Sequence, residues 1–430
     1  MVPRENVEIR VGPATDPERY RATDQLVWFE EPRDAPVQEQ VAGVPERLRF
    51  AAEVPGSDLE TYPGIYGVRP MTLSIPGPGS AAGTGVRQVP CAGLTWVGVH
   101  PDHRRTGILT AMLRHHFEQV REEGEAHVSA LHASEPAIYG RHGYGLASLE
   151  LAVHLGRGTT LVAPHLDEQA AKIRTRMSAA SEKGMPERIR ACQLAAGAQA
   201  LGAMVGAPDY YEMVCRRIPE HERDKEPMRV LFAQRDRADV GMAMFRREHK
   251  WERGRPSGKL EVLVVVGDPP ARLALLRRLV DFDLMGTVKL WGIGVEDPLH
   301  QWTAGPREAT DIEVADSLWV RLVDLPAALT GRSYAAPCDV VVEVSDTAAP
   351  WNEGSWRIVV DDAGSASVER TSADADLKLP VQALGAAYLG GTNLLGQVRA
   401  GVVLEARPGA ALGLWRALRA DVAPGTAIGF

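Results

Sequence analysis

The sequence is poor in cysteine and in long apolar runs. Its four cysteines, Cys91, Cys192, Cys215 and Cys338, are scattered among 430 residues. This spacing disfavours a disulfide framework and a cysteine-based metal site, and it fits a reducing compartment. One of the longest apolar runs, LEVLVVVG at 260–267, falls well short of the roughly 18 residues that a membrane helix needs. The first ten residues contain no signal-peptide core. We therefore expect a cytoplasmic protein.

Basic residues are outnumbered by acidic ones. The chain has 48 Lys and Arg against 56 Asp and Glu, a net charge of −8. This balance disfavours nucleic acid and anionic membranes as partners and is compatible with cationic ligands. The content of 45% hydrophobic and 24% charged residues is ordinary for a globular protein. A chain of 430 residues exceeds one ordinary core, so we expect two or three domains.

One stretch has the order strand, basic turn, helix. A run of β-favouring residues at 94–99 is followed by Arg104, Arg105 and Gly107. A helix is predicted from Ile108, because apolar residues then recur at intervals of three and four. The first amides of a helix lack internal partners and carry partial positive charge, so this turn suits a pyrophosphate. Taken alone, the same pattern is equally typical of a solvated surface turn.

The strand before this turn contains a glycine. Gly98 stands between Val97 and Val99, which predicts a bulge or a close backbone approach at this position. Free backbone groups there would be available to an extended ligand.

A second strand is predicted over 127–133, and it leads into Ser134 and the motif IYGRHGYG, which contains Tyr139. Together with VHPDHRRTGIL and ALHASE, this motif resembles the Eis (enhanced intracellular survival) family. That family consists of acetyl-CoA-dependent amine acetyltransferases of the GNAT superfamily. Leu109 departs from the Gly or Ala of the broader superfamily signature, but the Eis group shares this departure.

The resemblance implies a role for each matching residue. Tyr139 matches the general acid, and the terminal carboxylate of Phe430 matches the base. The residue before it, Gly429, is acidic in some relatives, which puts one acceptor contact in doubt. The basic turn is implied to hold the coenzyme A pyrophosphate, and the strand before it and Ser134 the pantetheine arm. The residues implied to bind the coenzyme are Val97, Val99, Arg104, Arg105, Gly107, Ile108 and Ser134.

The acceptor pocket has weaker signals. A helix predicted over 17–29 contains Trp28, and the acidic residues Glu30 and Glu31 follow it. The resemblance implies that this region forms one wall of the pocket. A solvated helix end is the alternative interpretation. His132, on the strand entering the site, is a candidate pocket residue, although a lone strand histidine is more often a core residue. No histidine has the spacing of a metal site, and we expect no metal.

The pattern strand, turn, helix recurs once. A strand over 259–266 leads through Asp268, Pro269 and Pro270 into a helix over 271–280. Proline lacks an amide donor and aspartate repels phosphate, so this copy is expected to have no coenzyme site. From 317 the pattern changes to alternating strands followed by helices. We expect a mixed α/β chain: a catalytic GNAT domain (1–160), a degenerate GNAT-like domain (161–316) and a sterol-carrier-like domain (317–430).

The sequence thus predicts an acetyl-CoA-dependent N-acetyltransferase. Its expected acceptors are amines of polycationic small molecules, such as aminoglycosides, polyamines or lysine-type compounds. The amine would attack the thioester directly, through a tetrahedral intermediate. The alternative is a non-catalytic protein that senses coenzyme A or binds a hydrophobic ligand in its last domain. The resemblance also implies a homo-hexamer built as a dimer of trimers.

Overall fold

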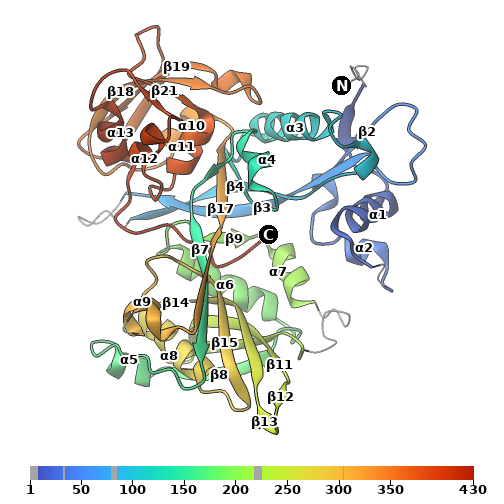
Figure 1. The fold of residues 1–430 in the computed structure, drawn as a ribbon, viewed down its shortest axis with the longest axis vertical. Helices are drawn as coiled ribbons and strands as arrows, with labels where there is room; N and C mark the ends of the chain where they lie inside the picture. Colours follow the sequence, from blue (N-terminus) through green and yellow to red (C-terminus); the bar gives the residue numbers. More distant parts are fainter. Residues whose placement is uncertain (1–7, 32–33, 79–84, 217–224, 304) are drawn as a thin grey trace.

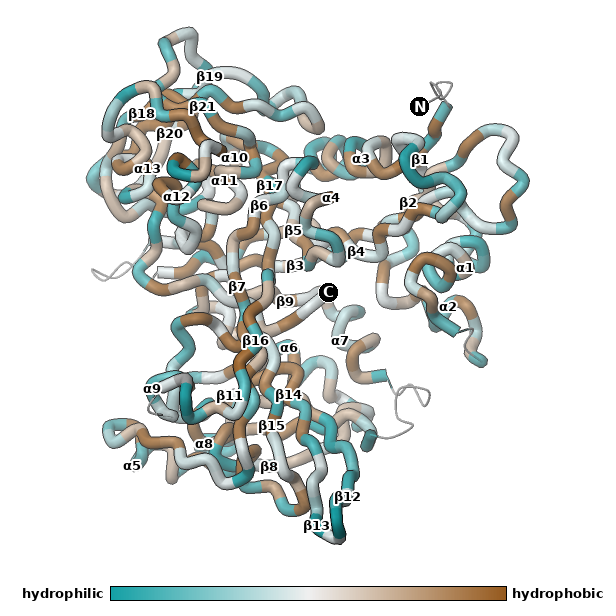
Figure 2. The backbone as a smooth tube through the Cα atoms, viewed as in Figure 1, coloured by the Kyte–Doolittle hydropathy of each residue, from teal (hydrophilic) through white to brown (hydrophobic). Residues whose placement is uncertain are grey.

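The computed structural model describes residues 8–31, 34–78, 85–216, 225–303 and 305–430, apart from the side chain of Pro306. Three bodies are seen in Figure 1: the first (blue to cyan), the second (green to yellow) and the third (orange to red). The sequence also predicts a first strand from Val7 and a turn-rich loop at 75–85; Val7 and residues 79–84 of that loop lie outside the described residues. The hydropathy colouring of Figure 2 shows a strongly hydrophilic tip on the second body, at β12 and β13.

The first sheet contains eight strands. Seven follow the order β1-β2-β3-β4-β5-β17-β6, and β9 pairs with β3. The long hairpin of β3 and β4 forms its centre, and its residues are largely buried. Their bounds are β1 Arg10–Pro13, β2 Arg49–Glu53, β3 Gly64–Pro76, β4 Val86–Val99, β5 Val128–His132, β6 Gly145–Leu146, β9 Met204–Gly206 and β17 Leu318–Leu322.

Four helices accompany this sheet: α1 Pro17–Trp28, α2 Val37–Gln40, α3 Ile108–Glu123 and α4 Pro136–Gly140. Helix α1 begins where the Asp16 side chain accepts a hydrogen bond from the Arg19 amide, and it ends at Phe29 in the left-handed conformation. Helix α3 buries its apolar stripe, which includes Met112, Leu113 and Phe117, against the sheet. The predicted strands and helices of this region are therefore present.

The second sheet contains seven strands in the order β16-β7-β15-β14-β11-β10-β8. Its strands are β7 Leu149–Gly156, β8 Arg174–Ala179, β10 Arg229–Arg235, β11 Ala238–Glu248, β14 Gly258–Gly267, β15 Met285–Ile293 and β16 Asp311–Asp316, and a short hairpin joins β12 Trp251–Glu252 to β13 Arg255–Pro256. Its helices are α5 Asp167–Ala171, α6 Met185–Gly197, α7 Pro208–Cys215, α8 Pro269–Val280 and α9 Leu299–Trp302.

One helix prediction is wrong in length. The sequence predicts a helix from 187 to 204, but α6 ends at Gly197 and is followed by β9. Gly202, which lies between α6 and β9, has a φ of +80°, a non-helical conformation that side-chain-bearing residues rarely adopt.

The two sheets exchange strands. Strand β7 follows the first body in sequence but lies between β16 and β15 of the second sheet. Strand β17 follows the second body but lies between β5 and β6 of the first sheet, where Val320 faces Ala130. The boundaries at 160 and 316 remain predictions about the chain, since the strands on either side are shared between sheets.

The third body is a five-stranded sheet in the order β20-β19-β18-β21-β22. Its strands are β18 Cys338–Ser345, β19 Gly354–Val360, β20 Ala366–Arg370, β21 Leu377–Pro380 and β22 Leu404–Glu405, with helices α10 Leu325–Thr330, α11 Val381–Ala387, α12 Leu394–Arg399 and α13 Ala410–Leu418. After α13 the chain returns to the centre of the molecule, where Figure 1 marks its C-terminus. Across the described ranges no helix is both long and apolar enough to cross a membrane.

Candidate active site

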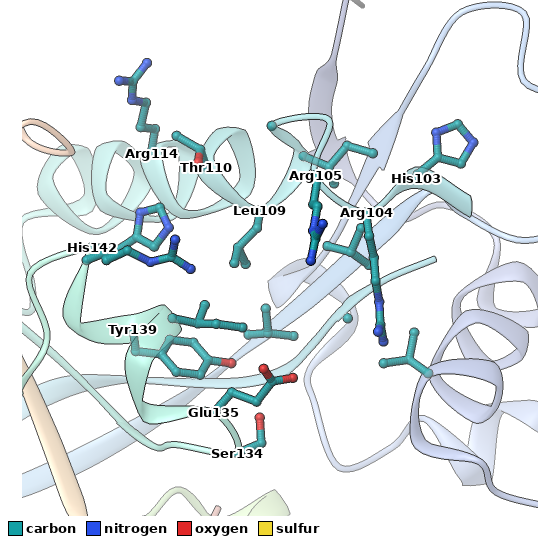
Figure 3. A pocket seen from close by; sticks show the side chains of 18 of the residues that line it. His103, Arg104, Arg105, Leu109, Thr110, Arg114, Ser134, Glu135, Tyr139 and His142 are labelled. Atoms are coloured by element: carbon teal, nitrogen blue, oxygen red, sulfur yellow. The ribbon is translucent and has the colours of Figure 1, made fainter. Parts of the chain in front are cut away.

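A pocket of about 1070 Å³ lies where α3 begins. It is enclosed by the end of α1, the end of β4, the basic turn, the first half of α3, α4 and a loop of the third body (Figure 3). The residues that line it and that the sequence predicts to be functional are Trp28, Val97, Val99, Arg104, Arg105, Gly107, Ile108, Ser134 and Tyr139. The structure therefore gathers the whole predicted coenzyme set around one cavity.

The turn before α3 is built to leave the helix terminus open. Gly107 is the N-cap residue, with a φ of +97° and no side chain to bond the first amides. A Cβ there would approach only Ile9, at 3.7 Å, so the backbone conformation and not crowding requires glycine. Arg104 and Arg105 extend from the turn toward the cavity in Figure 3. Open amides beside two guanidinium groups suit a phosphate ligand.

Strands β4 and β5 part at the pocket. They run parallel and pair only at Ala92 with Ser129 and at Gly93 with Ala130. From Leu94 onward β4 keeps its other partner, β3, while among the described strands none faces its β5 side. The backbone N–H and C=O groups on that edge of β4 can therefore form hydrogen bonds with the amide groups of a bound ligand.

The bulge predicted at Gly98 is at Trp96. The register of β3 and β4 shifts between Ile65, which faces Gly98, and Gly67, which faces Thr95, and Trp96 has a φ of +52°. Gly98 instead allows close packing, since a Cβ there would meet the Val27 side chain of α1 at 3.2 Å. The small residue thus brings α1 against the strand that borders the pocket.

Tyr139 is buried at the floor of the pocket, with its hydroxyl directed into it in Figure 3. Burial raises the pKa of the phenol, and a hydrogen bond with the Ser134 side chain only partly opposes this. The phenol is therefore protonated at neutral pH and can donate a proton. Its ring meets that of Tyr144 edge-on, with centroids 6.1 Å apart.

A buried hydrogen-bond chain supports Tyr144. The Ser129 hydroxyl donates to the Ala92 carbonyl at 2.9 Å, so it must accept from Tyr144 at 2.8 Å and from His116 Nε2 at 2.9 Å. His116 is therefore the neutral Nε2–H tautomer, and burial lowers its pKa to about 3.

The C-terminal tail ends where β4 and β5 separate. The Phe430 ring meets that of His132 edge-on, with centroids 5.2 Å apart, and a Cβ on Gly93 would lie 3.0 Å from Phe430. His132 Nε2 donates to the Ile428 carbonyl at 3.1 Å, and the Tyr210 hydroxyl donates to the Gly429 carbonyl at 2.8 Å. Burial lowers the pKa of His132. Neither Phe430 nor His132 is among the residues that line the pocket.

The predicted acceptor residues of α1 differ in their surroundings. Trp28 lines the pocket and is half exposed. Glu30 accepts from Arg21 Nη2 at 2.7 Å, so its charge is already compensated, and Glu31 is exposed. Neither glutamate lines the pocket.

A possible metal-binding group lies away from this pocket. Within the described ranges, one set of histidine and carboxylate side chains comes close together: His154 of β7 with Asp311 and Glu313 of β16. Glu313 Oε1 lies 3.2 Å from His154 Nε2 and 3.3 Å from Lys289 Nζ. The Lys289 ammonium therefore already forms an ion pair with Glu313, one of the three side chains that could bind a metal ion.

Several pocket residues were missed by the sequence prediction. Arg114 lies four residues after Thr110 on α3, a spacing that places both on one face of the helix, so helical periodicity could have found it. Arg141 and His142 stand inside the quoted motif. Thr347 and Ala348 come from the third body, and no local pattern marks them.

Known protein families match all three bodies. A model described as an acetyltransferase (GNAT) domain matches residues 81–147, a second model of that description matches residues 202–322, and a sterol carrier protein domain matches residues 325–424. The predicted fold class, two GNAT folds followed by a sterol-carrier-like domain, is confirmed.

Individual proteins are similar over most of the chain. An uncharacterized N-acetyltransferase of Streptomyces avermitilis is 37% identical over 384 residues, which cover 87% of this chain and 88% of that protein. N-acetyltransferase Eis of Mycobacterium tuberculosis is 28% identical over 322 residues, which cover 70% of this chain and 71% of Eis. The crystal structure of Eis1 from Mycobacterium abscessus has a TM-score of 0.78 at 26% identity and covers 98% of this chain and 100% of that one.

Proposed function

Because this chain belongs to the Eis-like GNAT N-acetyltransferases, with two GNAT domains and a sterol carrier protein domain, we propose that it transfers an acetyl group from acetyl-CoA to an amine of a polycationic small molecule. Aminoglycosides, polyamines and lysine-type compounds are the candidate acceptors. The observation that carries the proposal is the single pocket in which the basic turn, the open edge of β4 and Tyr139 meet.

Two features of the pocket suit the acyl donor. The uncapped start of α3, with Arg104 and Arg105 beside it, receives the pyrophosphate. The edge of β4 from Leu94 to Val99, which β5 leaves unpaired, offers its amides and carbonyls to the two amide groups of the pantetheine arm. Ser134 lies across the pocket near Tyr139, and in this proposal it contacts the pantetheine arm.

Tyr139 acts as the general acid in this proposal. The acceptor amine forms its bond to the thioester carbonyl, the carbon–sulfur bond breaks, and Tyr139 donates its proton to the departing sulfur. The phenol is protonated at neutral pH, as this role requires; its raised pKa adds nothing to its strength as an acid.

The terminal carboxylate of Phe430 acts as the base in the same proposal. Its place at the separation of β4 and β5, beside Gly93 and His132, supports this. A carboxyl with a pKa near 3.5 facing an ammonium near 10.4 differs by roughly 7 units, or about 9 kcal/mol for full proton transfer. Several ammonium groups that repel one another lower the amine pKa and reduce this difference, which favours polycationic acceptors over an isolated lysine.

Trp28 forms a wall of the acceptor region, and Glu31 and His132 are further candidates there; Glu30, paired with Arg21, is the weakest candidate.

The first test is thiol release from acetyl-CoA against aminoglycosides, polyamines, lysine and peptides. Release with multi-amine compounds is expected. Tyr139→Phe should lower turnover by about 100-fold or more and leave the dissociation constant for coenzyme A within about twofold. Tyr388→Phe removes a buried third-domain hydroxyl that donates to Ala328, and it serves as the control with unchanged turnover. Coenzyme binding without release to any amine would contradict the enzyme and favour a coenzyme sensor or a hydrophobic-ligand carrier.

The base is tested separately by extending the chain. Two glycines added after Phe430 move the carboxylate and are expected to abolish most turnover. Two glycines inserted in the exposed turn at 361–365 are the control. Full activity of the extended chain would remove Phe430 from the mechanism.

Assembly and location are also part of the proposal. The proposed assembly is a homo-hexamer built as a dimer of trimers, and the proposed location is the cytoplasm; the assembly is carried over from the resemblance to the Eis family. Sedimentation of the purified chain at several concentrations tests the assembly, and a monomer throughout would contradict it.

A further inference from the structure

The pocket contains a second group of cationic side chains. Arg114 lies in the second turn of α3, and Arg141 and His142 follow α4. Figure 3 shows Arg114 and His142 on the opposite side of the cavity from Arg104 and Arg105. All of these residues line the same pocket, so the cavity has basic groups at both ends.

The second group keeps an excess of positive charge. Arg114 Nη2 donates to the Thr347 carbonyl at 3.5 Å, and Arg141 Nε donates to the Ala137 carbonyl at 3.2 Å. In the part of the chain that the structure describes, neither guanidinium forms an ion pair with a carboxylate. Burial and the nearby Arg141, Arg321 and Arg114 lower the pKa of His142, so the histidine stays neutral and the charge comes from the arginines.

The third domain forms the outer wall of this end. Thr347 and Ala348 line the pocket and follow β18. Thr347 is exposed and lies against Arg114. The third domain therefore touches the cavity in which the acyl donor is proposed to bind.

A buried ion pair fixes that wall. Asp346 accepts two hydrogen bonds from Arg321 Nη2, at 2.6 and 2.7 Å, and both side chains are almost fully buried. Asp346 also accepts from the Ala349 amide and from Asn352 Nδ2, each at 3.0 Å. Arg321 belongs to β17 of the first sheet. Because breaking a buried pair leaves an uncompensated charge, the loop is held firmly against the first domain.

The spacing of the two cationic groups matches a ligand with two separate phosphates. Arg114 follows Gly107 by seven residues on α3, which is about 10 Å along the axis. Coenzyme A carries a pyrophosphate and, across the ribose, one further phosphate. A ligand that places its pyrophosphate on the Gly107 amides can direct the other phosphate along α3 toward Arg114 and Arg141.

We propose that Arg114 and Arg141, enclosed by Thr347 of the third domain, form a second anion subsite that binds the phosphate on the ribose of coenzyme A. The third domain is then part of the acyl-donor site. This inference rests on the proposed function, because it requires the coenzyme to occupy this pocket. Its contribution would be to binding and not to the chemical step, since the subsite lies at the far end of the coenzyme from the thioester.

Calorimetric titration of the full chain with coenzyme A and with 3′-dephospho-coenzyme A tests the subsite. The native chain is expected to bind coenzyme A about tenfold tighter or more. In the Arg114→Ala, Arg141→Ala double variant, this ratio should fall to within about twofold, while the affinity for the dephospho form stays the same. Equal affinity of the native chain for both compounds would overturn the second subsite. Failure of both to bind would overturn the proposed function instead.

A third-domain variant tests the wall itself. Thr347→Glu places a carboxylate beside Arg114 and should weaken coenzyme A about tenfold, with less effect on the dephospho form. Thr347→Gln has similar size without the charge, and Ser345→Glu adds the charge at an exposed position that does not line the pocket. Both controls should bind as the native chain does. If Thr347→Glu binds coenzyme A like Ser345→Glu, the third domain has no part in the site.

Discussion

The first and second GNAT domains start corresponding helices in opposite ways. In the first domain, α3 begins after Gly107, whose lack of a side chain leaves the first amides open beside Arg104 and Arg105. In the second domain, α8 begins after Asp268, whose carboxylate accepts from the Ala271 amide at 2.9 Å. Arg235 donates to the same carboxylate at 2.8 Å.

The difference teaches how an anion site is made or removed. The start of α8 already has its anion, supplied by the chain and neutralised by an arginine. The first turn of α3 contains no acidic residue, and we propose that an external phosphate takes that place. The residue at the N-cap, Asp268 in α8 and Gly107 in α3, distinguishes the capped helix start from the proposed ligand site.

The largest effect on activity is expected when the turn before α3 is given the N-cap residue of the turn before α8. Gly107→Asp places a carboxylate at the N-cap of α3, where it binds the open amides and repels phosphate. The KM for acetyl-CoA should rise about 100-fold or more, because charge-assisted hydrogen bonds of about 1.5–3 kcal/mol each are lost. Steady-state kinetics at varied acetyl-CoA measure this.

The control for this substitution is Gly107→Asn. Asparagine imposes the same strain at a φ of +97° without the charge, and its KM should rise about tenfold or less. Equal losses in the two variants would mean that strain, and not the anion site, causes the effect.

A smaller effect concerns the pH dependence of stability, to which four histidines of the first domain contribute. Burial lowers the pKa of His116 from 6.5 to about 3, and it also lowers the pKa values of His115, His132 and His142. The unfolded chain therefore binds protons below pH 6.5 that the folded chain does not. The stabilisation is complete above pH 6.5 and decreases as the pH falls toward 3, by up to about 1.4 kcal/mol per pH unit for His116 alone.

Replacing this histidine should flatten the pH dependence. His116→Gln is expected to unfold more easily at pH 7.5, because the hydrogen bond to Ser129 is weakened. Between pH 6.5 and 4.5 its free energy of unfolding should change less steeply than that of the native chain. Urea unfolding curves across this range give both slopes, and identical slopes would show that His116 does not titrate as described.

The smallest effect is expected when the N-cap side chain of α8 is removed. Asp268→Ala removes the cap of α8 and should lower the stability of the second domain by about 1 kcal/mol, while the KM for acetyl-CoA is unchanged. Asp268→Ser keeps a capping oxygen and should recover most of the loss. A changed KM in Asp268→Ala would mean that the second turn influences the acyl-donor site.

Much of the site could be predicted because its residues are close in sequence. The turn from Arg104 to Gly107 and the start of α3 are one local unit, so residue types and spacing predicted their local structure. Their role in binding the coenzyme was implied by the family resemblance and stays a prediction. Ser134 and Tyr139 fall within one short motif around α4. Gly98 was predicted to mark a bulge or a close backbone approach. The bulge is at Trp96, because sequence gives no information on how β4 is registered against β3, and Gly98 is instead where the Val27 side chain of α1 packs closely.

Other parts were decided by packing between distant segments. The exchange of β7 and β17 between the sheets depends on which edges are free after each sheet forms, and the strand sequences look alike in either place. The third-domain wall depends on the buried pair of Arg321, on β17 of the first sheet, and Asp346, which follows β18 of the five-stranded sheet. The position of Phe430 likewise depends on contacts with Gly93 and His132, far away in the chain.

By itself, the sequence determined the chemistry available at the first turn: an N-cap without a side chain, two arginines and a phenol within a few dozen residues. These properties are local, because helix starts and short turns depend on neighbouring residues. Only the tertiary structure decided what surrounds that chemistry, including the second cationic group, the third-domain wall and the tail at the separation of β4 and β5. Burial and long-range contacts set these features, and no local pattern encodes which distant surfaces will meet.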